Sequence, residues 1–160
     1  MRSAGSFVLA LAVAGCARGG PSVTPPSAGL GGPCPSSFVT DAPREARIVT
    51  LFADDAEARA ASRGVPSVCF GPSEGPGVLV GGRPRLDARA PDAELAGRLV
   101  HLGVHLQDGL GDGCLVGLAR AVASEQRAQV LETRVRALVG LAPLPDDGRA
   151  IADYTARCGR

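Results

Sequence analysis

The run LVHLGVHL at residues 99–106 decides how this 160-residue chain folds, and it holds both histidines of the protein. His101 and His105 are four residues apart, so on a helix of about 3.6 residues per turn they project from one face, one turn apart. Four leucines form a separate apolar stripe at helical spacing, namely Leu95, Leu99, Leu102 and Leu106. The pattern predicts a mostly buried helix that carries two imidazoles beside its apolar stripe.

A second and longer helix is expected from Cys114 to Val139, because that segment lacks proline and contains a single glycine. A loop rich in glycine and aspartate, residues 108–113, separates the two helices. On a helical wheel, Glu125 shares one side of the second helix with Ala121 and Ala128. Because small alanines let another helix approach closely, we expect the first helix to pack against this side.

The side chains that these two helices would bring together suit a metal ion. His101 and His105 offer imidazole nitrogens, and Glu125, twenty residues after the second histidine, offers a carboxylate oxygen. Two imidazoles and a carboxylate are a common zinc ligand set, in which water completes the tetrahedron. We therefore identify His101, His105 and Glu125 as candidate zinc ligands.

This arrangement resembles the core of the zincin metallopeptidases over roughly residues 79–141. Their motif is His-Glu-x-x-His on a helix, and in one large branch a Glu on a following helix is the third zinc ligand. The resemblance implies that His101, His105 and Glu125 hold the metal. The chain departs from the motif at Leu102, which stands where the family has the Glu that takes a proton from zinc-bound water. The resemblance thus implies a zincin-like domain without the catalytic base, in a binding or structural role.

Two other interpretations stay open at this point. A divergent zinc metallopeptidase would need another base, and neither Asp108 nor Glu132 matches the position of the family's base. A metal-free scaffold or interaction module would instead keep His101 and His105 as core histidines with backbone or carboxylate partners. In that case Glu125 and Glu132 would belong to a solvated face that is paired with the arginines of the same helix.

The amino terminus indicates export. Arg2 is followed by a short apolar run at residues 7–14, which is too short to span a bilayer, and then by Val-Ala-Gly-Cys at residues 13–16. Small residues before a cysteine at this place resemble a bacterial lipoprotein signal. The resemblance implies removal of residues 1–15 and attachment of lipid to the thiol and the new amino group of Cys16.

The segment after Cys16 predicts a tether in front of one folded domain. Residues 16–33 are rich in Gly, Pro and Ser and have almost nothing to bury, so they cannot offset the entropy of ordering. Residues 34–160 are long enough for a single core. Ala17 in place of Asp favours the outer membrane, so we expect a lipid-anchored envelope protein on its periplasmic face. Its partner would be an envelope protein or peptide that the sequence does not identify.

The four cysteines beyond Cys16 fit an oxidising compartment. Cys34, Cys69, Cys114 and Cys158 are widely spaced and contain no Cys-x-x-Cys pair, so they predict two disulfides. Of the three possible pairings we favour Cys34–Cys158, which would close the ends of the domain, together with Cys69–Cys114. A zinc site formed by these cysteines is the alternative.

Composition excludes a nucleic-acid partner. All 17 basic residues are arginine and they face 16 acidic residues, so the chain without Arg2 is neutral (16 against 16). No basic patch with interleaved aromatics is present, and aromatics are scarce, with four Phe and one Tyr. The core must therefore be built from Leu, Val and Ala.

The remaining elements complete an α+β prediction, in which short strands pack against a mainly helical layer that two disulfides pin. A helix is expected over residues 54–63 and a last short helix over 146–158, whereas residues 47–52 fit either a strand or a helix. Short strands are expected at residues 65–70, 77–80 and 85–87.

Overall fold

The computed structural model describes residues 33–73, 75, 77–110, 117–144, 152 and 155–156. Within these ranges the chain forms four helices and one small three-stranded sheet, so the α+β prediction is confirmed. The helices are α1 (Ala42–Thr50), α2 (Ala56–Arg63), α3 (Asp92–Gln107) and α4 (Leu118–Leu138). The strands are β1 (Cys69–Gly71), β2 (Gly77–Val80) and β3 (Arg83–Asp87).

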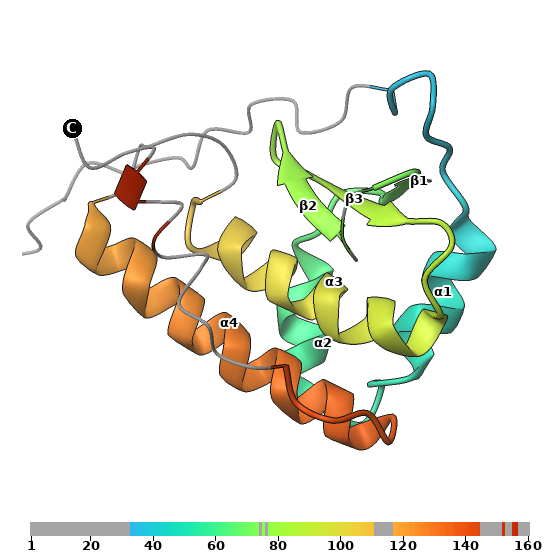
Figure 1. The fold of residues 1–160 in the computed structure, drawn as a ribbon. Coiled ribbons are helices and arrows are strands. Elements are labelled where there is room, and N and C mark those ends of the chain that lie inside the picture. Colours follow the sequence, from blue (N-terminus) through green and yellow to red (C-terminus); the bar gives the residue numbers. More distant parts are fainter. Residues whose placement is uncertain are drawn as a thin grey trace, which may run out of the picture.

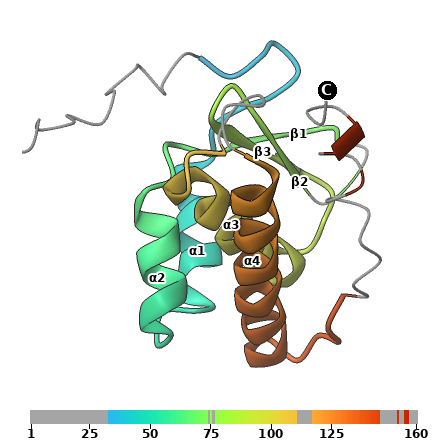
Figure 2. The ribbon, with the colours of Figure 1, turned by 90° about the vertical axis from the view of Figure 1, so that its left-hand side faces the viewer.

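Helix α3 lies at the centre of the molecule. It runs beneath the sheet (Figure 1), with α1 and α2 on one side and α4 on the other (Figure 2). Every residue from Leu95 to Val104 except Arg98 is buried. This helix is therefore enclosed on nearly all sides, and its leucine stripe joins the main hydrophobic core.

Two glycines of α3 let the neighbouring helices come close. A Cβ at Gly103 would lie 2.5 Å from the backbone oxygen of Ala61, so α2 touches the α3 backbone there. A Cβ at Gly97 would lie 3.0 Å from Cγ of Arg136 and 3.3 Å from Cγ of Glu132 on α4. Helix α3 is thus wedged between α2 and α4 at distances that only small residues permit.

The first two helices begin at aspartate caps. Asp41 accepts a hydrogen bond from the backbone N–H of Arg44, and Asp55 accepts from the N–H groups at the start of α2. Helix α2 ends at Gly64, as the sequence predicts. The segment at residues 47–52, which the sequence left open between strand and helix, belongs mainly to α1.

The sheet has the order β1-β3-β2, in which β1 is parallel and β2 antiparallel to the central β3. Strand β2 has the predicted bounds, whereas β1 covers only the end of the strand expected at residues 65–70. Pro84 and Leu86 of β3 are buried, and the alternate residues of that strand are half-buried. One face of the sheet therefore rests on the core, as alternation in a strand requires.

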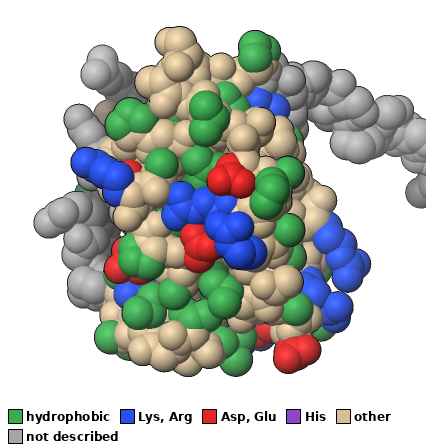
Figure 3. Space-filling model, turned by 90° about the vertical axis from the view of Figure 1, so that its right-hand side faces the viewer, with side chains coloured by type: hydrophobic (Ala, Val, Ile, Leu, Met, Phe, Trp, Pro, Cys, Tyr) green, Lys and Arg blue, Asp and Glu red, His purple; other side chains and the backbone are tan. Residues whose placement is uncertain are grey.

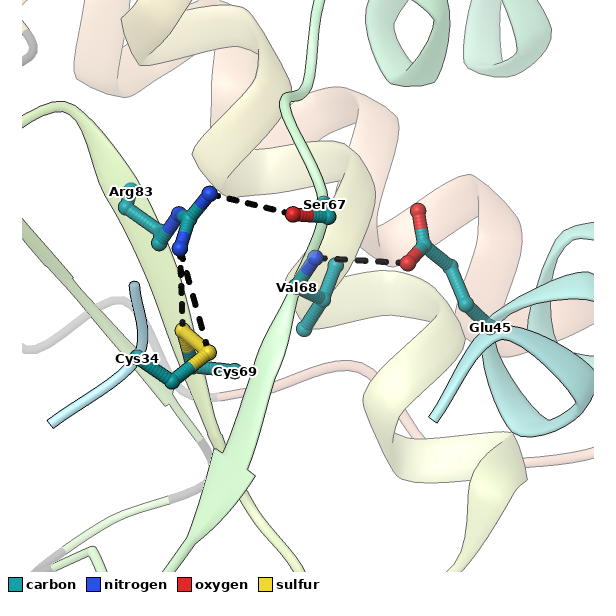
Figure 4. The surroundings of a disulfide bond; sticks show 6 residues. All are labelled: Cys34, Glu45, Ser67, Val68, Cys69 and Arg83. Atoms are coloured by element: carbon teal, nitrogen blue, oxygen red, sulfur yellow. Dashed lines mark hydrogen bonds between the residues drawn. A yellow bond between two sulfur atoms is a disulfide. The ribbon is translucent and has the colours of Figure 1, made fainter. Parts of the chain in front are cut away.

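The predicted cysteine pairing is wrong, because Cys34 forms a disulfide with Cys69 (Figure 4). An isolated bridge between Val39 and Phe70 holds the N-terminal segment along β1, and a turn at residues 35–38 folds the chain back beside the strand. Residues far apart in sequence are thereby placed side by side, which spacing alone could not reveal. The bond also rules out a cysteine zinc site that uses either residue, whereas Cys114 and Cys158 lie outside the described residues.

Other predictions fall wholly or partly outside the described ranges. The leader at residues 1–15 and the tether at 16–33, with Cys16, are among them, as is most of the helix expected at 146–158. Helix α4 begins at Leu118, later than the predicted start at Cys114, and Gly117 is the residue that precedes its first turn. In the part of the chain that is described, no helix combines the length and the apolar character needed to cross a membrane.

Charges of both signs are mixed on the surface. On the face drawn in Figure 3, arginine and acidic side chains lie next to one another among hydrophobic ones. Ion pairs on the surface show the same mixture of charges, for example Arg127 with Asp108 at 2.9 Å and Arg134 with Glu57 at 2.8 Å. Such pairs on the surface contribute little to stability, so the fold depends on its core.

Breaking the disulfide should destabilise the domain. Because the bond closes a loop over a sequence separation of 35 residues, we expect Cys34→Ser to lower the free energy of unfolding by about 2–5 kcal/mol. Urea unfolding of the purified domain measures this change. Cys69→Ser and the double variant should match the single variant, since all three remove one bond; additive losses would contradict the pairing.

Candidate metal centre

Three side chains from two helices meet inside the interface between α3 and α4. His101 and His105 project from α3, and Glu125 reaches them from α4. The two Nε2 atoms are 2.9 Å apart, and the Oε2 atom of Glu125 lies 3.0 Å from Nε2 of His105 and 3.6 Å from Nε2 of His101. The structure thus brings together the three residues that the sequence singles out, with one potential ligand atom from each.

The triangle formed by these atoms has the size of a metal site. A point about 2 Å from all three atoms exists just off their plane, which matches the usual zinc bond lengths to imidazole nitrogen and carboxylate oxygen. Ligand atoms about 3–3.5 Å apart are what tetrahedral coordination at that bond length requires. His101, His105 and Glu125 could therefore hold a metal ion.

The cluster is largely shielded from water. The side chain of His101 is 5% exposed, that of Glu125 12% and that of His105 16%. The solvent-exposed part of the cluster belongs mainly to His105 and Glu125. An ion and a fourth ligand would therefore approach from the side of these two residues. Such burial strengthens electrostatic interactions within the cluster.

Each histidine also has a polar neighbour at the ring nitrogen turned away from the triangle. Nδ1 of His105 lies 3.0 Å from Oγ of Ser124, and Nδ1 of His101 lies 2.8 Å from Oε2 of Glu132. Although the carboxylate of Glu132 lies this close, the buried Nδ1 of His101 has no well-aligned hydrogen bond within the described part of the chain. Outer partners of this kind orient metal-binding histidines and fix which nitrogen faces the ion.

Sequence reasoning assigned no such role to Ser124 or Glu132. Ser124 directly precedes the candidate ligand Glu125, and Glu132 follows that ligand by seven residues, which is two turns of the same helix face. The seven-residue spacing could have indicated a second carboxylate aimed at the same partner helix. Without the distance between α3 and α4, however, it also fits an ordinary surface face.

The cluster shifts the protonation of its members. Burial by itself would lower the pKa of His101, but its contacts with Glu125 and Glu132 outweigh burial and raise that pKa above the usual range. Burial likewise opposes ionisation of Glu125, yet the hydrogen bonds from His101 and His105 dominate and hold its pKa far below normal. In the absence of a metal, the carboxylate is thus ionised and acts as an acceptor for the imidazoles.

Comparisons with protein families, curated proteins and solved structures find no match to this chain.

The position at which the zincin motif carries its Glu is occupied by a core residue. Leu102 is 2% exposed and belongs to the main hydrophobic cluster, so this position presents no proton acceptor to a bound water. Glu132 lies on the Nδ1 side of His101, and Asp108 accepts a hydrogen bond from Arg127 at 2.9 Å. The arrangement can bind and polarise a ligand, but none of these described carboxylates is placed as a general base.

Replacing this core residue by the base of the zincin motif should damage the fold without creating an enzyme. Because Leu102→Glu would bury an unpaired carboxylate, we expect a loss of at least about 3 kcal/mol in the free energy of unfolding. Leu138→Glu is the matched control, since Leu138 is 57% exposed and should tolerate the change within about 0.5 kcal/mol. Urea unfolding and a peptidase assay test both variants; a stable, peptide-cleaving Leu102→Glu protein would show that this position opens onto the metal.

Proposed function

We propose that this chain is a lipid-anchored bacterial envelope protein whose folded domain binds one zinc ion in a zincin-like site and does not hydrolyse peptides. Its role would be to bind an envelope protein or peptide, or to support structure, with the metal as part of the site. The chain would reach its place through the leader at residues 1–15 and lipid on Cys16.

One observation carries the metal assignment: three potential ligand atoms converge within 3.6 Å of one another inside the protein. Two imidazole nitrogens and a carboxylate oxygen around one point are a donor set and a spacing that a metal ion can use. The choice of zinc follows from the donor set, because nitrogen from histidine with one carboxylate in a tetrahedral site suits zinc better than it suits calcium or magnesium.

The absence of hydrolysis is proposed from the surroundings of the site. A zincin cleaves a peptide because a glutamate next to the first histidine accepts the proton of the zinc-bound water. In this chain that position holds Leu102, which is buried among apolar side chains. A bound water would be polarised by the ion but would have no acceptor for its proton at this place.

Two features support the envelope location. The signal-like residues 13–16 stand before a segment rich in Gly, Pro and Ser that can act as a tether. The Cys34–Cys69 disulfide, which begins the folded part, fits a protein that matures in an oxidising compartment. Both features are expected of a domain held at a membrane by a lipidated amino terminus.

The metal proposal predicts a shared loss of zinc in three variants. The purified domain should bind one zinc ion, and His101→Ala, His105→Ala and Glu125→Ala should each weaken binding more than about 100-fold, beyond the range usual for outer partners of a ligand. Competitive titration with a chromogenic chelator measures the affinity, and a peptidase assay on the zinc-loaded wild type should show no cleavage.

Asp54→Ala serves as the control, because it removes an exposed carboxylate far along the chain from the cluster and should leave zinc binding unchanged. Circular dichroism should show that each variant is folded. A wild-type domain that binds no zinc would leave only the scaffold interpretation. Cleavage that disappears with His101→Ala would show instead that the protein is a divergent metallopeptidase with another base.

The anchoring proposal has its own test. Cys16→Ala removes the thiol that would carry the lipid, so we expect the protein to leave the membrane fraction or to keep its leader. Fractionation of bacterial envelopes with immunodetection, together with the mass of the mature amino terminus, measures both outcomes. A Cys16→Ala protein that is processed and retained like the wild type would contradict lipid attachment.

A further inference from the structure

Arg98 is the one residue between Leu95 and Val104 that is not buried. It connects the sheet with the candidate metal centre formed by His101, His105 and Glu125. Its Nε donates a hydrogen bond of 2.9 Å to the backbone oxygen of Gly77 in β2. Its Nη1 lies 3.9 Å from Oε2 of Glu132, the same oxygen that approaches Nδ1 of His101. A continuous set of contacts thus runs from the strand through the guanidinium and the carboxylate to a candidate ligand.

The carbonyl group of Gly77, which accepts this hydrogen bond from Arg98, belongs to the edge strand β2. Leu79 of β2 is opposite Pro84, which has no N–H, so this pair is not hydrogen-bonded, and neither is the pair of Gly77 with Leu86 two residues away. The carbonyl of Gly77 therefore points away from β3, where Arg98 meets it. Because a Cβ at Gly77 would lie 3.1 Å from Cγ of Arg98, the strand also confines the arginine stem.

Glu132 needs a counter-charge. Its side chain is 5% exposed, and a buried carboxylate is costly without a charged partner or good hydrogen bonds. When His101 binds a metal its imidazole is neutral, so it can offer only an N–H dipole to Glu132. In the described part of the chain, Arg98 is the arginine whose guanidinium comes within 4 Å of this carboxylate.

We propose that Arg98 is a positioning residue for the metal site, which acts through Glu132 to hold the His101 ring with Nε2 facing the ion. This inference rests on the proposed metal binding. The arginine keeps the carboxylate beside Nδ1, the carboxylate favours the tautomer with the proton on Nδ1, and Nε2 is left with its lone pair toward His105 and Glu125. Arg98 itself does not touch the metal.

The test combines zinc affinity with the state of the imidazole. Arg98→Met keeps much of the side-chain volume but removes the charge, and it should weaken zinc binding by about tenfold, the lower end of the range for outer partners. Arg98→Lys restores the charge and should recover part of the loss. In the metal-free domain at alkaline pH, where the imidazole is neutral, nitrogen-15 NMR of the rings should show His101 of the wild type protonated at Nδ1, and Arg98→Met should raise the population protonated at Nε2.

A double variant shows whether the arginine works through Glu132. If it does, adding Arg98→Met to Glu132→Gln should weaken zinc binding no further than Glu132→Gln alone. Arg134→Met is the matched control: it removes the same charge at an exposed position two residues from Glu132, and it should change neither affinity nor tautomer.

The outcomes separate this inference from the function on which it rests. If the wild type binds no zinc, the proposed function fails and this inference fails with it. If the wild type binds zinc but Arg98→Met binds equally well, or if the two substitutions add, only the role of Arg98 is overturned. Urea unfolding of each variant shows whether a loss of affinity reflects a loss of folding; equal affinity losses in Arg98→Met and Arg134→Met would also overturn it.

Discussion

The contact between two carboxylates of α4 and two imidazoles of α3 is the constraint on which the rest of this structure depends. Glu125 and Glu132 enter the interface between the two helices, and there they meet His101 and His105. Burying these four polar groups in a small domain opposes folding unless each finds partners. Close partners lie at 2.8–3.0 Å, although the contact of Glu132 with Nδ1 of His101 is not a well-aligned hydrogen bond, and a metal ion would bind three of the four groups at once.

The packing around α3 makes this contact possible. Gly97 and Gly103 remove side-chain bulk where α4 and α2 approach, so the two layers close on the central helix. The alanines of α4 beside Glu125 act in the same way from the opposite surface, since Ala121 and Ala128 are buried. An ion site made from side chains of two helices needs this closeness, because ligand atoms that stay more than a few ångströms apart cannot share one ion.

The sheet and the disulfide support the cluster from a distance. The sheet covers α3 and presents the carbonyl of Gly77 to Arg98, which joins the strand to the carboxylate of Glu132. The Cys34–Cys69 bond fastens the start of the folded part to β1 and so to the strand that pairs with β3. Burying the polar cluster in the helix interface costs free energy of desolvation. The large apolar core offsets this cost and stabilises the fold.

The sequence by itself determined the local features of this protein. The spacing of His101 and His105 set their common face, and the stop at Gly64 and the bounds of β2 followed from glycine and proline chemistry. Tertiary structure decided the remainder, because contacts between distant segments depend on how elements pack. The Cys34–Cys69 pairing depended on the bridge between Val39 and Phe70, and the places of Glu132 and Arg98 depended on the distances from α3 to α4 and β2. Sequence periodicity tells which face a side chain is on, whereas only the fold tells what that face meets.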